Sequence, residues 1–206
     1  MNSCGINIGS TSVKVVLCNN NEIQKFCVLP HEGDVPGTLG KIVAGIGIPD
    51  NAKAIVTGNE GRFMINLPRV IESVCIEEVL RHLAVDPVAV VSMGGEDLVV
   101  YTIGEDKKIK TSFSGNKCAA GTGEFFKQQL ARMDMTLNDV ASIPADSKVM
   151  KLSTRCSVFM KSDCTHRLNK GEATKGDIVL SLSNVMAIKV VDFLKKARIQ
   201  KGVVVL

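Results

Sequence analysis

The chain has 206 residues, 45% of them apolar, so it is a globular protein that can bury the core of one large domain or of two small lobes. Its formal net charge of +4 is mild, and Lys and Arg are spread along the sequence without the basic stripe of a nucleic-acid-binding protein, so no nucleic acid partner is expected. The first residues lack a secretory signal and no apolar run approaches membrane-spanning length, so we expect a cytoplasmic protein with no membrane partner.

Residues 4–29 contain three short β-rich runs separated by a Gly-Ser-Thr turn and an Asn-rich turn. This pattern predicts a meander of three antiparallel strands. A short apolar helical pattern follows from Val35 to Ile46, then a buried strand at 52–58 and a helix within 67–83. We expect these elements to form a first lobe over residues 1–86.

The same order of elements begins again in a second lobe, predicted over residues 87–206. Residues 88–103 predict two strands around a Gly-Gly turn, and 107–114 predict a third. Further helices are predicted from about 118 to 133, at 137–142, 156–171 and 175–197, and further strands at 148–153 and 203–206. Two successive units of this kind favour a duplicated α/β architecture over one doubly wound sheet. Because an apolar strand ends the sequence, we expect the C-terminal elements to be truncated.

The first glycine-containing turn places Gly9, Ser10 and Thr11 at the tip of a hairpin. Backbone N–H groups and hydroxyls at such a tip can converge on phosphate oxygens, and Lys14 adds a cation nearby. An ordinary tight turn explains the same residues, because glycine and serine are common in turns. This motif alone leaves both interpretations open.

A second hairpin at residues 92–97 strengthens the first interpretation. Gly94 and Gly95 would let the backbone approach a ligand closely, and Glu96 can hold a metal-bound water. Two such hairpins, each opening its own lobe, can clamp a triphosphate between them. No run matches the Walker loop, and the stretch near Gly45 lacks the third glycine of a dinucleotide-binding fingerprint.

Two of the seven cysteines, Cys118 and Cys156, precede predicted helices. The unpaired N–H groups and the dipole at a helix N-terminus favour the thiolate, which is the form that binds metal. For the isolated cysteines we expect small core side chains instead; these are Cys4, Cys18, Cys27 and Cys75. Cys164 is ambiguous, since with Cys156 and His166 it sketches an incomplete zinc site, but packing on a helix explains it more simply.

A four-iron cluster requires four thiolates, and the two favoured cysteines supply half of that number. A symmetric dimer supplies the rest, because a twofold axis through the cluster presents the same two cysteines from each subunit.

These motifs resemble those of the activators of 2-hydroxyacyl-CoA dehydratases, which are grouped with the ATPase subunits of benzoyl-CoA reductases. The resemblance spans nearly the whole chain. NIGSTSVK at 7–14 and SMGGED at 92–97 resemble the phosphate motifs of the family, while NKCAAGTGEFF at 116–126 and STRCSVFMKSD at 153–163 resemble its more specific cluster-cysteine motifs. The forms of these motifs look most like the N-terminal module of the long, multidomain activators.

The resemblance implies a duplicated ribonuclease-H-like fold of the actin and sugar-kinase superfamily, with ATP or ADP and Mg²⁺ in the cleft. It also implies one [4Fe-4S] cluster per dimer, held by Cys118 and Cys156, and further cofactor-binding positions at Gly121, Thr122 and Gly123. The implied activity is ATP-driven transfer of one electron to a CoA-ester dehydratase or reductase. The implied electron donor is a ferredoxin or flavodoxin.

Three departures from the family pattern concern hydrolysis and completeness. Asn7 and Ser92 stand where the shorter activators have acidic residues, which predicts weakened metal binding or hydrolysis. Glu96 replaces an amide of the shorter members and can take over the positioning of water or magnesium, so it is the predicted catalytic residue. The sequence ends at Leu206, where the family continues into elements that close the adenosine pocket.

Two other functions compete with the activator. The first is a non-hydrolysing iron-sulfur carrier or docking module of a larger protein, its ATPase lost through Asn7 and Ser92. The second is a small-molecule kinase of the same fold, which needs a carboxylate base beside the substrate hydroxyl. The candidate bases Asp97 and Glu124 are explained equally well as a solvated strand residue and as an acid in the first turn of a helix.

Overall fold

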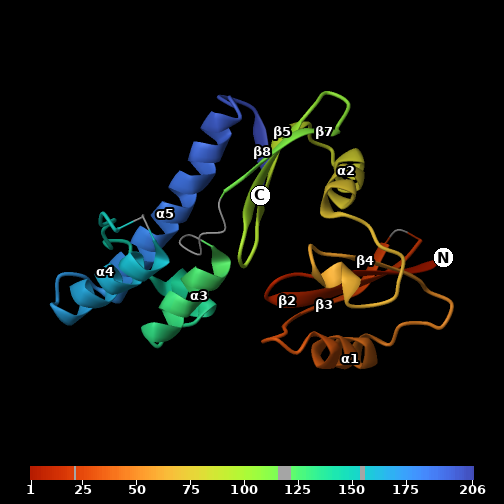
Figure 1. Cartoon of the computed structure of the whole chain (residues 1–206), viewed down its shortest axis with the longest axis horizontal. Coiled ribbons are helices and arrows are strands. Elements are labelled where there is room, and N and C mark those ends of the chain that lie inside the picture. Colours follow the sequence, from red (N-terminus) through yellow and green to blue (C-terminus); the bar gives the residue numbers. More distant parts are fainter. Residues whose placement is uncertain (21, 116–121, 154–155) are drawn as a thin grey trace. The chain divides into compact units, whose positions relative to one another are not determined.

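Two four-stranded sheets organise the chain, one in the unit Met1–Ala84 and one in the unit Val85–Leu206 (Figure 1). The structure is a computed structural model that describes residues 1–20, 22–115, 122–153 and 156–206. Across these described ranges, no helix combines the length and the apolar character needed to cross a membrane.

The sheet of the first unit has the strand order β3-β2-β1-β4. Its strands are β1 (Asn2–Ile8), β2 (Ser12–Asn19), β3 (Glu22–Pro30) and β4 (Lys53–Thr57). The first three are antiparallel neighbours, and β4 runs parallel to β1. This arrangement confirms the predicted meander and the strand that follows it, but the expected burial of that strand is wrong, because β4 lies at the edge of the sheet and only Val56 is buried.

Alternation of apolar side chains along β1 and β2 buries one face of this sheet. Ile6, Ile8 and Val13 lie in the core of the unit, because successive side chains of a strand point to opposite faces. The helix α1 (Val35–Ile46) packs against β2 and β3 and contributes to the same core. Asp34 caps its N-terminus by accepting a hydrogen bond from the N–H of Gly37 at 2.9 Å. The unit also contains η1 (Gly61–Phe63) and α2 (Glu72–His82).

The sheet of the second unit has the order β7-β6-β5-β8, which repeats the order of the first. Its strands are β5 (Pro87–Met93), β6 (Leu98–Ile103), β7 (Ile109–Ser114) and β8 (Val203–Val205). Again three strands form an antiparallel meander, and the fourth runs parallel to the first of them. The repeated order confirms the predicted duplicated α/β architecture.

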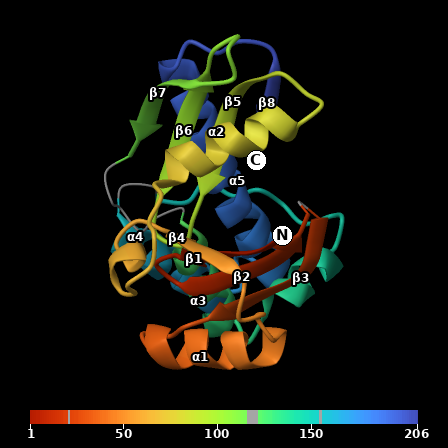
Figure 2. The ribbon, with the colours of Figure 1, turned by 90° about the vertical axis from the view of Figure 1, so that its right-hand side faces the viewer.

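The helices of the second unit form a core of their own beside the sheet. They are α3 (Gly123–Arg132), η2 (Leu137–Ser142), α4 (Ser157–Asn169) and α5 (Lys175–Lys196). The long helix α5 passes behind β6 and β7 and packs against both (Figure 2). Its buried residues Ile178, Leu182 and Val185 follow helical spacing and meet Met160 of α4 in one cluster.

The predicted strand at 148–153 is wrong. Residues 148–153 form neither a helix nor a strand and pair with no described strand. Their N–H groups bond to side chains of α4 and α5, which replaces the pairing that a strand would need. Leu152 of this segment lies in the helical core, so the segment packs against helices and not in a sheet.

Candidate functional site

The first hairpin joins β1 to β2 through a tight turn. The N–H of Gly9 donates to the carbonyl oxygen of Ser12 at 3.0 Å, which closes the turn around Ser10 and Thr11. The side chain of Ser10 is exposed at the tip. Three of the predicted phosphate-binding residues, Gly9, Ser10 and Thr11, therefore lie together at one turn, as the sequence predicts.

Polar side chains converge on the open side of this turn. Lys14 lies directly across the ladder from Asn7, and its Nζ donates to Ser12 Oγ at 2.9 Å. A Cβ added at Gly9 would lie 3.5 Å from Lys14 Nζ and 3.6 Å from Asn7 Oδ1, which is ordinary contact. The turn itself therefore tolerates a side chain, and glycine leaves the space between the ammonium and the amide open.

Two residues that the sequence did not single out brace this hairpin. His31 Nε2 donates to the carbonyl oxygen of Gly9 at 3.2 Å, and its Nδ1 accepts from Gly33 N–H at 3.0 Å, a pair of contacts that places the ring proton on Nε2. Gly58 has φ +116°, and a Cβ there would lie 2.1 Å from the carbonyl oxygen of Ile8. Glycine at position 58 thus lets the end of β4 approach the base of the hairpin.

A buried hydroxyl without a partner lies beside the hairpin. Among the described residues, the side-chain oxygen of Thr57 is the one buried polar side-chain atom that lacks a hydrogen-bond partner. Thr57 pairs with Asn7 across the parallel strands β4 and β1, so both lie at the carboxyl ends of these strands. Ligands of open α/β sheets bind at such ends, and this position in the sequence pattern is the signal that could have identified Thr57.

A cavity of about 310 Å³ opens on the face of the first sheet that α1 does not cover. The polar side chains of Asn7, Lys14 and Thr57 line it, and the rest of the lining is mainly apolar, including Val16 and Ile55. A few polar groups in an otherwise apolar pocket are typical of small-molecule sites. Asn7, Lys14 and Thr57 of the first unit therefore lie around one mainly apolar space, with the Thr57 oxygen itself buried.

The second hairpin joins β5 to β6 through Gly94, Gly95, Glu96 and Asp97. The N–H of Gly94 donates to the carbonyl oxygen of Asp97 at 2.8 Å and closes this turn. The side chains of Glu96 and Asp97 are exposed. The turn has the same topological position as the first hairpin, but it carries the carboxylates Glu96 and Asp97 where the first carries Thr11 and Ser12.

The N-terminus of α3 is bonded to this second hairpin. The N–H of Gly123 donates to Gly94 O at 3.1 Å, and the N–H of Glu124 donates to Gly95 O at 2.9 Å. Thr122 is buried, and a Cβ at Gly123 would lie 3.1 Å from Gly94 O. Thr122 and Gly123, which are predicted cofactor-binding positions, thus join the hairpin to the helix. Gly121, the third such position, lies outside the described residues.

Cys156 precedes α4 at its N-cap position and is partly exposed. The N–H of Met160 donates to the carbonyl oxygen of Cys156 at 3.0 Å, which makes the cysteine the start of the helical ladder. The first turn of α4 carries no acidic residue, and helix geometry leaves its first N–H groups without intrahelical partners. The N-terminus of such a helix favours a bound anionic group. Cys118, the predicted companion of Cys156, lies outside the described residues.

Cys164 lies in a different environment on the same helix. It is buried in the helical core, and burial, aided by the charge of Asp163, raises the pKa of its thiol to about 11. Burial also raises the pKa of Cys4, with Cys18 as the second cause. In the described part of the chain, no three His, Cys, Asp or Glu side chains gather to hold a metal ion. Packing accounts for Cys164.

The two residues considered as kinase bases, Glu124 and Asp97, lie in a helix first turn and in the second hairpin. Glu124 lies in the first turn of α3, and its side chain accepts a hydrogen bond from Gln128 at 3.0 Å. Asp97 lies in the second hairpin and closes the turn through its backbone oxygen. The structure thus groups the predicted residues within each unit, while the predicted clamp between the two hairpins stays a prediction.

The model of the BadF/BadG/BcrA/BcrD ATPase family matches residues 59–206 of the chain. The chain is 25% identical over 213 residues to the 2-hydroxyisocaproyl-CoA dehydratase activator of Clostridioides difficile, covering 99% of this chain and 79% of that relative. It is also 25% identical over 213 residues to the activator of lactoyl-CoA dehydratase of Anaerotignum propionicum, covering 99% of this chain and 82% of that relative.

A solved structure shows the same fold. The activator of the 2-hydroxyisocaproyl-CoA dehydratase from Clostridium difficile with bound ADPNP superimposes with a TM-score of 0.87 at 24% sequence identity. The match covers 100% of this chain and 80% of that one. This likeness confirms the predicted fold class, a duplicated α/β fold of the actin and sugar-kinase kind.

Proposed function

The chain belongs to the BadF/BadG/BcrA/BcrD ATPase family, and from this premise we propose that it is an ATP-dependent one-electron-transfer activator of a CoA-ester dehydratase or reductase. In this proposal Cys118 and Cys156 of each subunit hold one [4Fe-4S] cluster at the twofold axis of a homodimer. When bound, such a cluster takes up and gives off one electron at a time.

The position of Cys156 carries the proposal. A partly exposed sulfur at the N-cap of a helix with no acid in its first turn is placed to reach a metal centre, whereas Cys164, two turns further along, is buried in the helical core. The residues at the N-terminus of α4 therefore fit an iron-sulfur cluster bound through Cys156. Cys118 is proposed as the second ligand because its sequence motif resembles the first cluster-cysteine motif of the family.

Exposed apolar side chains beside Cys156 support a dimer around the cluster. Val158 and Phe159, in the first turn of α4, are 64% and 63% exposed. Large apolar side chains at a functional surface are typical of protein contacts. A twofold contact at this turn would cover both side chains and bring two copies of Cys156 together.

In this proposal, residues of the two hairpins bind the nucleotide. Gly9, Ser10, Thr11 and Lys14 would bind phosphate oxygens through N–H groups, hydroxyls and an ammonium. Gly94 and Gly95 would approach the phosphates from the other lobe, and Glu96 would position Mg²⁺ or the attacking water. Binding and hydrolysis of ATP would then change the angle between the helices that bear the cluster.

The partners follow from the relatives. The two curated relatives described above are named as activators of CoA-ester dehydratases. We propose a dehydratase or reductase of that class as the electron acceptor, and a ferredoxin or flavodoxin as the donor.

One observation favours a second function, a non-hydrolysing iron-sulfur carrier or docking module. Asn7 lies opposite Lys14 and beside Thr57, at the carboxyl end of β1. A neutral amide there cannot act as an anionic ligand of Mg²⁺ or as a base. The two functions differ in one measurable property, the hydrolysis of ATP.

The decisive experiment is anaerobic purification followed by iron and sulfide analysis, with visible and EPR spectra. The activator and the carrier both predict about four irons per dimer. Cys118→Ala and Cys156→Ala should each lose the cluster, whereas Cys164→Ala on the same helix should keep it. If either of the first two variants retains full iron, or the wild-type protein binds none, the cluster proposal fails.

ATP hydrolysis by the cluster-loaded protein then separates the two functions. The activator predicts steady release of phosphate that falls about 100-fold in Glu96→Gln, the size of effect expected when a group that positions water or metal is neutralised. Asp97→Asn, in the same turn, is the matched control and should hydrolyse ATP at the wild-type rate. A dimer that holds its cluster and releases no phosphate would instead be the carrier.

A further inference from the structure

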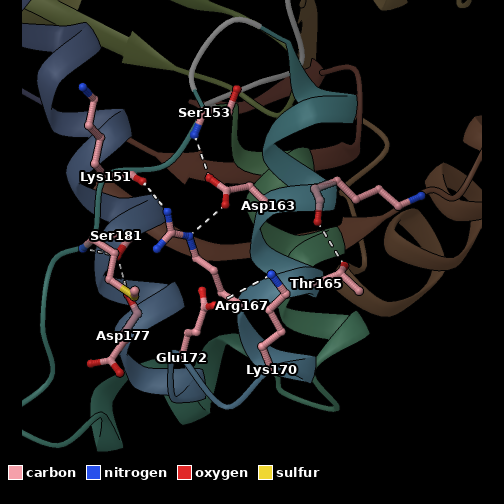
Figure 3. Close-up of polar contacts among 11 residues, drawn as sticks. Lys151, Ser153, Asp163, Thr165, Arg167, Lys170, Glu172, Asp177 and Ser181 are labelled. Carbon is pink, nitrogen blue, oxygen red and sulfur yellow. Dashed lines mark hydrogen bonds and ion pairs between the residues drawn. The ribbon is translucent and has the colours of Figure 1, made fainter.

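The segment that leads into Cys156 is held by side chains of two helices. The N–H of Lys148 donates to Asp177 Oδ1 at 2.6 Å, and the N–H of Met150 donates to Ser181 Oγ at 2.8 Å, both on α5. The N–H of Ser153 donates to Asp163 Oδ2 of α4 at 3.0 Å. We call residues 148–153 the strap. Because it has no neighbouring strand, these contacts fix its place (Figure 3).

Asp163 and Arg167 close the strap onto α4. Arg167 Nε donates to Asp163 Oδ1 at 2.8 Å, and its NH2 donates to the carbonyl oxygen of Lys151 at 3.2 Å. Figure 3 shows Arg167 reaching from α4 toward both Asp163 and Lys151. One carboxylate and one guanidinium thus bind two backbone groups of the strap, at Lys151 and at Ser153.

This pair is less exposed than the other ion pairs of the chain for which both side chains are described. The side chains of Arg167 and Asp163 are 28% and 25% exposed, so water screens the contact less than at the surface. Hydrogen bonding to Asp163 raises the pKa of the Arg167 guanidinium, and the charge of the same carboxylate adds to the effect. The pair therefore has a defined geometry that a single substitution can disturb.

We infer that Asp163 and Arg167 are positioning residues for the sulfur of Cys156. Ser153 lies three residues before Cys156, a stretch that spans at most about 10 Å when fully extended. Cys156 therefore begins α4 on one side and follows the anchored strap at a distance of three residues on the other. Asp163 and Arg167 belong to α4, so they join the strap to the same helix that Cys156 begins, while Asp177 and Ser181 join its earlier residues to α5. The inference rests on the proposed role of Cys156 as a cluster ligand.

The first test measures the thiol without any cluster. In iron-free protein kept under argon, the rate of Cys156 alkylation by iodoacetamide is followed by peptide mass spectrometry for wild type, Asp163→Asn and Arg167→Lys. Losing one charged hydrogen bond should raise this rate about fivefold, because the strap opens more often. Cys164, buried on the same helix, serves as the internal reference and should stay unreactive.

Asp106→Asn is the matched control. Asp106 has the same construction, an ion pair with Lys110 four residues later at 3.0 Å and a hydrogen bond from the N–H of Lys108 at 3.3 Å, but it lies in the turn between β6 and β7. In the Asp106→Asn variant, Cys156 should be alkylated at the wild-type rate. If Asp163→Asn and Arg167→Lys both stay within twofold of Asp106→Asn, the inference is wrong.

The second test uses the cluster-loaded dimer. If Asp163 and Arg167 only stabilise the fold, the EPR signal of the cluster should not change when they are substituted. With iron content and melting temperature matched, the EPR signal of the reduced cluster in Arg167→Lys should shift or split into two species, because the sulfur of Cys156 takes more than one position. An unchanged spectrum would overturn the inference alone. Absence of a cluster in the wild-type protein would overturn the proposed function, while the alkylation rates would still decide whether the pair positions Cys156.

Discussion

The two glycine hairpins occupy the same place in the two copies of one topology, yet they are built differently. The first is in contact with Gly58 and His31; Lys14 lies beside a cavity there, and the buried hydroxyl of Thr57 lies next to Asn7. The second binds the N-terminus of α3 through its own carbonyl oxygens and presents Glu96. Duplication has thus kept the backbone while the chemistry of the two copies has diverged. A cation belongs to one copy and a carboxylate to the other.

The largest effect is expected from the brace of the first hairpin. Gly58→Ala adds a Cβ 2.1 Å from the carbonyl oxygen of Ile8 and forces alanine into φ +116°. Urea denaturation should show a loss of at least about 3 kcal/mol in the free energy of unfolding. Gly33→Ala is the control, since Gly33 also has positive φ but open space around it. It should lose only about 1 kcal/mol, and equal losses in the two variants would refute the close packing at Ile8.

A smaller effect should separate ligand binding from stability. Lys14 is exposed, so Lys14→Met should leave the free energy of unfolding unchanged while weakening MgATP binding. Loss of one charge-assisted phosphate contact raises the dissociation constant about 20-fold, which isothermal titration calorimetry can measure. Lys25→Met, on β3 of the same unit, should bind as wild type does. Unchanged affinity in Lys14→Met would remove the first hairpin from the phosphate site.

The unpaired hydroxyl gives a prediction whose sign is opposite for folding and for binding. Thr57→Val replaces a buried oxygen that lacks a partner by a methyl group of similar size. The free energy of unfolding should rise by about 1 kcal/mol, because an unmet desolvation cost disappears. MgATP affinity should fall in the same variant if the hydroxyl serves the ligand. A stability loss above about 1 kcal/mol would show that the hydroxyl has a partner in solution.

The last prediction concerns the stability of the second unit at low pH. Hydrogen bonds lower the pKa of Asp177, chiefly from the N–H of Lys148, and the pKa values of Asp106 and Asp139 are also lowered by hydrogen bonds. All three lie in the second unit, and each stabilises it above the unfolded pKa of 3.8 and stops doing so as pH falls through the lower folded value. Tyr101, the single tyrosine, reports on this unit from β6. Its fluorescence should change on acidification below pH 3.8, and Asp177→Asn should show a shallower change. An identical acid profile in Asp177→Asn would contradict the hydrogen bonds.

The sequence predicted both meanders and both hairpins because their signals are local. Alternating apolar residues and the turn residues around Gly9 and Gly94 act within a few positions of one another. The cap position of Cys156 was predictable for the same reason, since it depends on the helix that follows directly.

What the sequence did not show depends on contacts between distant positions. The strap at 148–153 reads as a strand, because nothing local reveals that Asp177 and Ser181, 29 and 31 residues away from their amides, take up its N–H groups. The roles of Gly58 and Thr57 likewise arise only when β4 pairs with β1. The pairing of Asp163 with Ser153 is of the same kind, across 10 residues.

Native mass spectrometry of the anaerobically purified protein tests the shared iron-sulfur centre most directly. We predict a dimer whose mass exceeds that of two chains by one [4Fe-4S] cluster, and which separates into iron-free monomers when Cys156 is replaced by alanine. A monomer that carries its own cluster, or a dimer without iron whose formation does not depend on Cys156, would contradict this account.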